Sequence, residues 1–216
     1  METESFDRVV DMATRLPLAQ QEMLVEIIRT KPAITGPRFD GQAMTLARFA
    51  ALPDDGYRYE YLKGVAAMMS PSGGLHGRNA TQMVALLWNH LDAGDAGHIF
   101  DSSTGYRLPN GDVRVPDVSI ILAGRLLNEE DPVGFIDTAP DLAVEIISPS
   151  ERYEDVQQKI TQYLDWGVKA VWVVEPPTRT VAVHARERIT RLQEGETLDG
   201  GNAVPGFACP VEEIFP

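Results

Sequence analysis

Cysteine and long hydrophobic runs are nearly missing from this sequence. Cys209 is the only cysteine among the 216 residues, so no disulfide can form within the chain. No apolar run approaches the roughly 18 residues of a membrane-spanning helix, and the first residues are acidic, unlike the basic start of a signal peptide. We therefore expect a cytoplasmic protein without a membrane segment.

Basic residues are also scarce relative to acidic ones. The chain has 19 Lys and Arg against 32 Asp and Glu, which gives a net charge of −13. Such a protein repels a polyanion at long range, so binding to DNA would require a local basic cluster or a bound cation. The candidates for that cluster are Arg58, Lys63, Arg78, Arg107 and Arg114.

The chain divides into segments of different composition. Residues 1–30 predict a helical hairpin, because apolar side chains recur at helical spacing before and after Pro17. Two prolines and two glycines mark residues 31–43 as a linker. From 44 to 216, strand and helix patterns predict one mixed α/β domain, in which a helix crosses over to a further strand.

The predicted hairpin has apolar faces on both of its helices. No later segment is obviously reserved to cover these faces. Closed two-fold pairing is the commonest way to bury such surface, so we expect a homodimer.

Three acidic residues occur within apolar strand patterns, namely Glu60, Asp117 and Glu145. A buried carboxylate is costly unless a cation or hydrogen bonds replace its water. If the strands of Asp117 and Glu145 are neighbours, the two carboxylates can share one cation. The sequence has no Cys/His cluster, which favours a hard ion such as Mg²⁺ over zinc. The alternative is that Glu145 faces solvent or pairs with Arg114 or Arg152.

Other polar residues occur close to these segments. Lys159 flanks the apolar stripe of a predicted helix, where it could orient a water molecule or contact a phosphate, or simply pack at the core margin. His76 follows a glycine loop and could hydrogen-bond a phosphate, or could be an ordinary helix-start residue. Ser148 adds a hydroxyl and a backbone N–H directly after the Glu145 strand.

Taken together, these motifs resemble the Uma-type family of restriction endonucleases. The resemblance rests on RVPDV at 114–118, LAVEIISPS at 142–150, Lys159 with Tyr163 and Gly167, and VWVV at 171–174. YEYLKG at 59–64, and the Ser-Pro pair at 70–71 followed by His76, resemble the same family. The similarity covers about residues 44–216.

The resemblance implies a PD-(D/E)XK nuclease fold, a central mixed sheet flanked by helices. It implies that Asp117 and Glu145 are catalytic metal ligands and that Glu60 is an accessory acid. It also implies that Lys159 serves as the catalytic lysine, since Ile147 occupies the usual lysine position on the strand. His76, Ser148, Tyr163 and Arg114 are further candidates for contact with the substrate.

The first hypothesis is a Mg²⁺-dependent endonuclease that hydrolyses DNA phosphodiester bonds, with Mn²⁺ as a possible substitute. A metal would lower the pKa of a bound water and neutralise the phosphate. Two alternatives remain open. One is a catalytically inactive interaction protein built on a nuclease fold. The other is a metal-dependent hydrolase of a small phosphorylated molecule, which would suit the acidic surface better.

Overall fold

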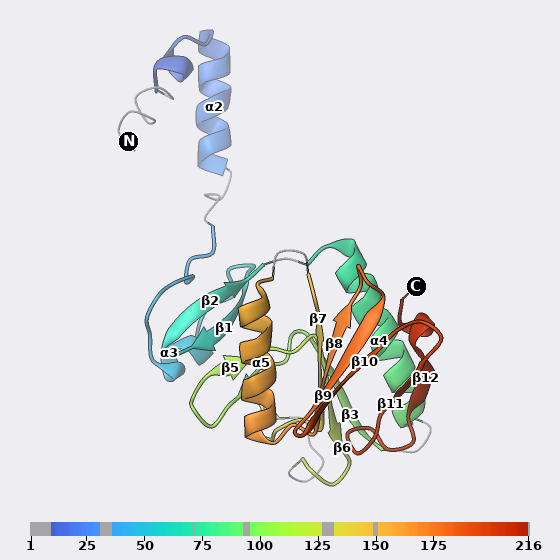
Figure 1. Cartoon of the computed structure of the whole chain (residues 1–216). Coiled ribbons are helices and arrows are strands. Elements are labelled where there is room, and N and C mark those ends of the chain that lie inside the picture. Colours follow the sequence, from blue (N-terminus) through green and yellow to red (C-terminus); the bar gives the residue numbers. More distant parts are fainter. Residues whose placement is uncertain are drawn as a thin grey trace. The chain divides into compact units, whose positions relative to one another are not determined.

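The chain consists of two compact units in this computed structural model. The structure describes residues 10–30, 36–70, 72–92, 96–126, 132–148 and 151–215, and the two units are Met1–Arg38 and Phe39–Pro216, the latter called the main domain below (Figure 1). The main domain begins earlier than residue 44, because part of the predicted linker pairs with a strand. The N–H of Gly41 donates to the carbonyl of Ala66, and Ala43 forms a β-bridge with Val65.

The smaller unit contains helical residues 10–14 and helix α2 (Leu18–Thr30). Pro17 precedes α2, and its carbonyl accepts the N–H groups of Gln20 and Gln21, as the first turn of a helix requires. Residues 1–9 of the predicted hairpin lie outside the described residues. Large apolar side chains are exposed on this unit, namely those of Val10, Met12, Leu16, Leu18, Met23 and Val25.

The main domain is built on a six-stranded sheet in the order β10-β9-β8-β7-β6-β3. The strands are β3 (Gly97–Asp101), β6 (Val118–Leu122), β7 (Leu142–Ile146), β8 (Ala170–Glu175), β9 (Thr180–Ala185) and β10 (Arg188–Leu192). Strands β7 and β8 are parallel and joined by helix α5 (Tyr153–Trp166), whereas the other neighbours are antiparallel. The sheet is therefore mixed, with one helical crossover as the sequence predicted.

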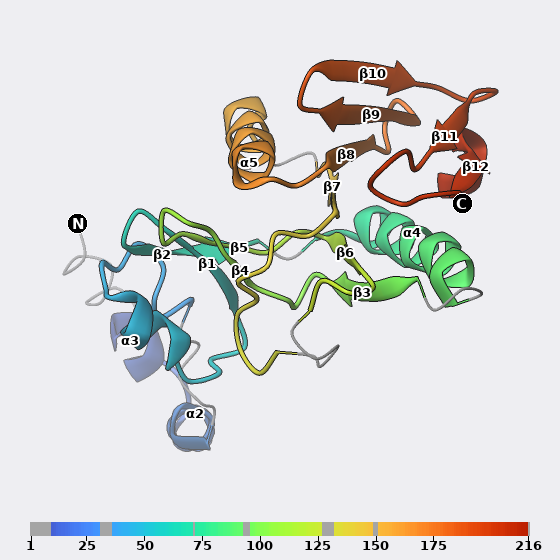
Figure 2. The same ribbon diagram turned by 90° about the horizontal axis from the view of Figure 1, so that it is seen from below.

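A four-stranded sheet in the order β2-β1-β5-β4 lies beside the large sheet (Figures 1 and 2). Its strands are β1 (Arg58–Leu62), β2 (Val65–Met69), β4 (Tyr106–Arg107) and β5 (Val113–Arg114), and helix α3 (Leu46–Ala50) precedes them. The apolar pattern over residues 113–122 predicts one continuous strand, and this prediction is wrong. Pro116 lacks an N–H for a sheet ladder, and the chain passes there from β5 in the small sheet to β6 in the large one.

Helices cover the two faces of the large sheet (Figure 2). Helix α4 (Gly74–Asp92) packs on one face with the C-terminal elements β11 (Thr197–Asp199), β12 (Ala208–Pro210) and η2 (Val211–Ile214), and α5 packs on the other. Along β7, Leu142, Val144 and Ile146 join the α4 side, while Ala143 joins the α5 side. Because successive side chains of a strand point to opposite faces of the sheet, the side chain of Glu145 points toward α5.

A glycine just past the apolar stripe of residues 156–164 predicts the end of helix α5, and the helix ends there. Gly167 has a φ of 109° and caps the helix, and its N–H donates to the carbonyl of Leu164.

Among the described residues, no helix combines the length and the apolar character that crossing a membrane requires.

Candidate active site

Asp117 lies directly before β6, where the chain enters the large sheet. Its Oδ2 accepts the N–H of Ile146 at 2.7 Å and lies 3.1 Å from Nε2 of His76. Its Oδ1 has no hydrogen-bond partner among the residues that the structure describes. Because Ile146 follows Glu145, the bond to Ile146 fixes Asp117 beside the strand that carries the second carboxylate.

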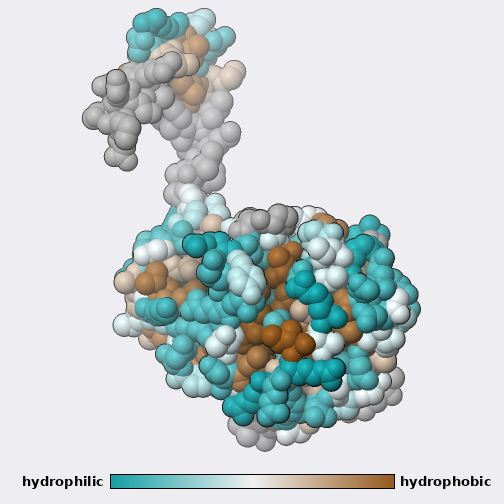
Figure 3. Space-filling view, viewed as in Figure 1, coloured by the Kyte–Doolittle hydropathy of each residue, from teal (hydrophilic) through white to brown (hydrophobic). Residues whose placement is uncertain are grey.

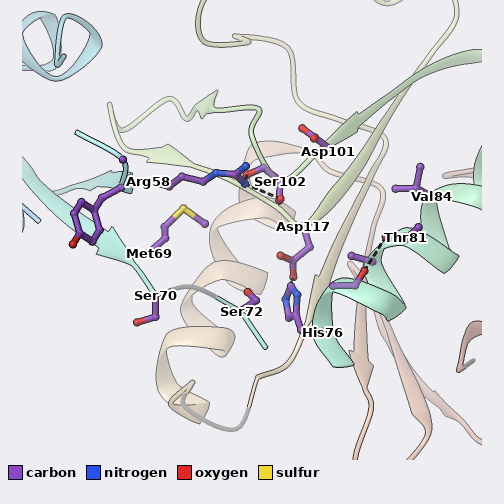
Figure 4. Close-up of a pocket in the computed structure, with 14 residues that line it drawn as sticks. Arg58, Met69, Ser70, Ser72, His76, Thr81, Val84, Asp101, Ser102 and Asp117 are labelled. Carbon is purple, nitrogen blue, oxygen red and sulfur yellow. Dashed lines mark hydrogen bonds and ion pairs between the residues drawn. The ribbon is translucent and has the colours of Figure 1, made fainter. Parts of the chain in front are cut away.

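His76 occupies the first turn of α4, and its side chain points toward Asp117 (Figure 4). The hydrogen bond to Asp117 raises the pKa of His76, although partial burial opposes this. Both residues line two neighbouring cavities. One, of about 480 Å³, also contains Lys159 and is called the cleft below; the other, of about 560 Å³, also contains Arg58.

Glu145 is held between two side chains of α5. Lys159 Nζ lies 2.7 Å from its Oε2, and the Tyr163 hydroxyl donates to its Oε1 at 3.1 Å. Lys159 and Tyr163 are four residues apart, so they share one face of the helix. Burial raises the pKa of Glu145 to about 7, against the opposing effect of the Lys159 charge, and the charge of Asp117 adds to the increase.

Lys159 contacts Glu145 and also lines the cleft. Burial opposes its charge, but Glu145, Glu60 and Glu151 outweigh burial and raise the pKa of Lys159, so it is an ammonium at neutral pH. Its Nζ is 3.4 Å from Oε1 of Glu151, whose Oε2 accepts the N–H of Ser148. Glu151 was not predicted as a site residue, because nothing in its local sequence pattern distinguishes it from a solvated loop acid.

Glu60 and Arg114 form a buried ion pair, with Arg114 Nη1 2.7 Å from Glu60 Oε2. Oε1 of Glu60 accepts the N–H of Val115, two residues before Asp117, and Arg114 Nε donates to Gln162 on α5. Both oxygens of Glu60 are therefore engaged in positioning the backbone that leads to Asp117. Gln162 was also missed, although it lies three residues after Lys159 and so shares its side of the helix.

The remaining candidates take different positions. Tyr163 is fully buried, so it positions Glu145 rather than contacting a substrate in the cleft. Ser148 lines the cleft, whereas Pro149 and Ser150 of the same motif lie outside the described residues. Arg114 lines the cleft, but its side chain is 4% exposed and committed to Glu60.

The described residues that line the cleft do not form a basic surface. Its charged lining consists of Glu60, Asp117, Glu151 and Asp155 with Arg114, Arg152 and Lys159, besides His76. Of the five predicted cluster residues, Arg114 lines the cleft and Arg58 lines the neighbouring cavity. Arg107 instead pairs with Asp137. The predicted candidates therefore do not gather into a basic cluster at the cleft.

Comparison with known proteins identifies the family. The model of the Uma2 family, described as "Putative restriction endonuclease", matches residues 46–212, and the chain therefore belongs to this family. The predicted resemblance is confirmed. No curated protein matches the chain.

A solved structure supports the same fold. It is the crystal structure of a "putative nuclease belonging to DUF820" from Anabaena variabilis, with a TM-score of 0.71 and 20% sequence identity. The match covers 80% of this chain and 97% of that one. The predicted fold class, a mixed α/β domain of the nuclease type, is confirmed.

Proposed function

We propose that this protein is a Mg²⁺-dependent endonuclease that hydrolyses phosphodiester bonds in DNA. The observation that carries the proposal is the arrangement of Asp117, Glu145 and Lys159. The carboxylate of Asp117 accepts the backbone N–H of the residue that follows Glu145. The ammonium of Lys159, which lines the cleft, contacts the carboxylate of Glu145. Membership of a family described as restriction endonucleases supports DNA as the substrate.

The donor set suits a hard cation. Asp117 offers an oxygen without a hydrogen-bond partner among the described residues, and Glu145 adds a second carboxylate, the ligand type that Mg²⁺ prefers. No group of three Asp, Glu, His or Cys side chains among the described residues could hold a metal by itself. Two carboxylates still fit, because Mg²⁺ usually keeps several waters. When bound, the ion would supply an activated water and neutralise phosphate charge.

The side chains around the carboxylates have distinct tasks in this proposal. Lys159 presents a positive charge at the cleft, where it stabilises the charge that develops on the phosphate in the transition state. Tyr163 and Lys159 together hold Glu145 in place. His76 orients Asp117 and lines the path by which a phosphate would enter.

A second candidate function is hydrolysis of a small phosphorylated molecule. The mixed charge of the cleft favours it, because a wide basic groove that would hold a DNA backbone is not formed by the described lining residues. The volume of about 480 Å³ is within the range of small-molecule sites.

We also propose that the protein acts as a cytoplasmic homodimer. The exposed apolar side chains of the smaller unit, such as Leu18 and Met23, support pairing with a second copy. The lone cysteine, Cys209, is consistent with a reducing compartment.

The test is cleavage of supercoiled plasmid in the presence of Mg²⁺ or Mn²⁺, with Asp117→Ala as the inactive control. We expect nicked and linear products from the wild type and none from the variant. Bis(p-nitrophenyl) phosphate, assayed in parallel, reports on a small substrate. Hydrolysis of this compound without plasmid cleavage would favour the second function, and inactivity on both would favour a non-catalytic interaction protein.

A further inference from the structure

A further cavity lies on the α5 face of the large sheet and shares Glu151, but no other lining residue, with the cleft. It has a volume of about 480 Å³ and is bounded by the first turns of α5 and by strands β8, β9 and β10. We call it the α5 groove. Figure 3 shows apolar surface gathered between α5 and these strands.

The groove exists because one helix cannot cover this face. Helix α5 packs on Ala143 of β7 and on Val171 and Val173 of β8. Strands are spaced about 4.8 Å apart and a helix is about 10 Å wide, so the surface of β9 and β10 extends beyond it. Tyr153 on α5 and Ile189 on β10 are consequently 74% and 68% exposed.

His184 on β9 is the unusual polar residue of the groove. It is 8% exposed, lines the cavity and forms no hydrogen bond with any residue that the structure describes. Burial lowers the pKa of His184, helped by the nearby charge of Arg191, so its ring is neutral at pH 7. A neutral imidazole offers one donor and one acceptor, and neither ring nitrogen is bonded to a described residue, so both are available to a guest in the cavity.

The charged residues at the groove already have partners. Arg191 pairs with Glu175 at 2.9 Å, and Glu151 accepts hydrogen bonds from Ser148 and Lys159. No unpaired cation is therefore offered by the described lining residues, so an anionic guest would lose its water without gaining a charged partner. The walls are mainly aliphatic, including Ile147, Val156 and Ala182.

We propose that the α5 groove binds a neutral, largely apolar small molecule through one hydrogen bond to His184. The volume is within the range of about 300–1,000 Å³ that small-molecule sites occupy, and such sites combine apolar walls with few placed polar groups. The guest completes the hydrogen bonding of His184 and covers the exposed side chain of Ile189. The groove meets the cleft only at Glu151, and binding in it does not require the proposed nuclease activity.

The test uses 2-naphthol, an apolar bicycle with one neutral hydroxyl, titrated into the full chain and followed by NMR with ¹³C-labelled histidine rings. We expect saturable binding that shifts the ring signals of His184. The matched anion, 2-naphthalenesulfonate, should bind at least about tenfold more weakly, since the groove has no unpaired cation among its described lining residues to replace the water that the sulfonate would lose. Equal affinity for the two compounds, or no saturation with 2-naphthol, would overturn the proposal.

Two variants identify the site. His184→Phe keeps the ring shape and should weaken 2-naphthol binding about three- to tenfold through the lost hydrogen bond. Ile189→Ser changes a largely exposed residue, so the fold is retained, and should weaken binding about tenfold by removing an apolar wall. The matched control is Val133→Ser, which alters another exposed aliphatic residue and should leave the Kd unchanged. Unchanged affinity in both groove variants would place the ligand elsewhere.

Discussion

The Oδ2 atom of Asp117 lies 2.7 Å from the backbone nitrogen of Ile146, the residue that follows Glu145. Val118 and Val144, the neighbours of the two acids, are paired across β6 and β7. The two carboxylates are thus fixed by the sheet itself rather than by a loop. An amide in place of the Asp117 carboxylate can still accept this N–H, which makes Asp117→Asn a milder test than alanine.

Metal binding should depend on both acids. We expect calorimetry with Mn²⁺ to give about one site in the wild type and none in Glu145→Gln or Asp117→Asn, because each variant removes a charged ligand. Asp155→Asn is the matched control, since Asp155 lines the same cleft as Asp117 and the variant removes the same charge. Equal binding by Glu145→Gln and the wild type would remove Glu145 from the site.

Replacing Lys159 should reduce cleavage strongly. Loss of one preorganised charge-stabilising group typically costs about 100- to 1,000-fold in rate, so we expect that range for Lys159→Met. Lys159→Arg should rescue little, because a planar fork does not replace a compact ammonium. Gln158→Ala, which changes the adjacent lining residue, is the control. A wild-type rate in Lys159→Met would exclude Lys159 from catalysis.

The same variant should change the pH dependence of metal binding. Lys159 opposes the increase in the pKa of Glu145, which is already about 7 in the native protein. Without the ammonium, the pKa of Glu145 rises further and its proton is retained at neutral pH. Mn²⁺ affinity of Lys159→Met should therefore be weaker at pH 7 and increase as the pH is raised, as calorimetry over pH 6–9 would measure. A pH profile identical to that of the wild type would contradict this.

Acid should destabilise the fold through Asp141, which is fully buried. Burial favours its neutral form, but Lys169, the N–H of Leu122 and Arg125 outweigh burial and lower the pKa of Asp141. Its folded pKa is below its unfolded value, so this stabilisation is present above about pH 4 and is lost as the pH falls further. Urea unfolding should show Asp141→Asn about 3 kcal/mol less stable at pH 7, with a flatter acid profile.

The control for that series is Asp137→Asn. Asp137 also pairs with an arginine, Arg107, but its side chain is 59% exposed. Surface ion pairs contribute little, so its unfolding free energy should match that of the wild type within about 1 kcal/mol. If Asp137→Asn lowered the unfolding free energy as much as Asp141→Asn, burial of Asp141 would not be the reason for the loss of stability.

Removing residues 1–30 should convert a dimer to a monomer, because the exposed apolar side chains of α2 would be lost. Light scattering coupled to size exclusion measures the mass. The double variant Leu18→Ser with Met23→Ser should have the same effect without truncation. An identical mass in all three proteins would show that the smaller unit does not hold two copies together.

Much of the main domain could be predicted from local patterns. The apolar run around Glu145 predicts a central strand, which is β7, and the helical spacing of Val156, Ile160 and Leu164 predicts α5. The Lys63-Gly64 pair between two strand patterns likewise predicts a tight turn, and both residues have positive φ. These features depend on neighbouring residues, which is why the sequence alone reveals them.

The site was harder to predict where it depends on distant parts of the chain. Local sequence patterns leave open whether the strands of Asp117 and Glu145 are neighbours, since strand order is a property of the whole sheet. The pairing of Glu60 with Arg114 joins residues 54 positions apart on different strands. No periodic pattern reports such a contact, so the positioning role of Glu60 could only be read from the structure.

Helix α5 brings Lys159 and Tyr163 to Glu145, whereas both carboxylates belong to the sheet region. Local opening of α5 alone would therefore separate the ammonium from its partner while leaving Asp117 and Glu145 in register. The fraction of molecules with an intact site would then be set by the free energy of local unfolding of α5, rather than by that of unfolding the whole domain. Native-state hydrogen exchange measures this local free energy. The protein could thus lose its site at denaturant concentrations at which the sheet remains folded.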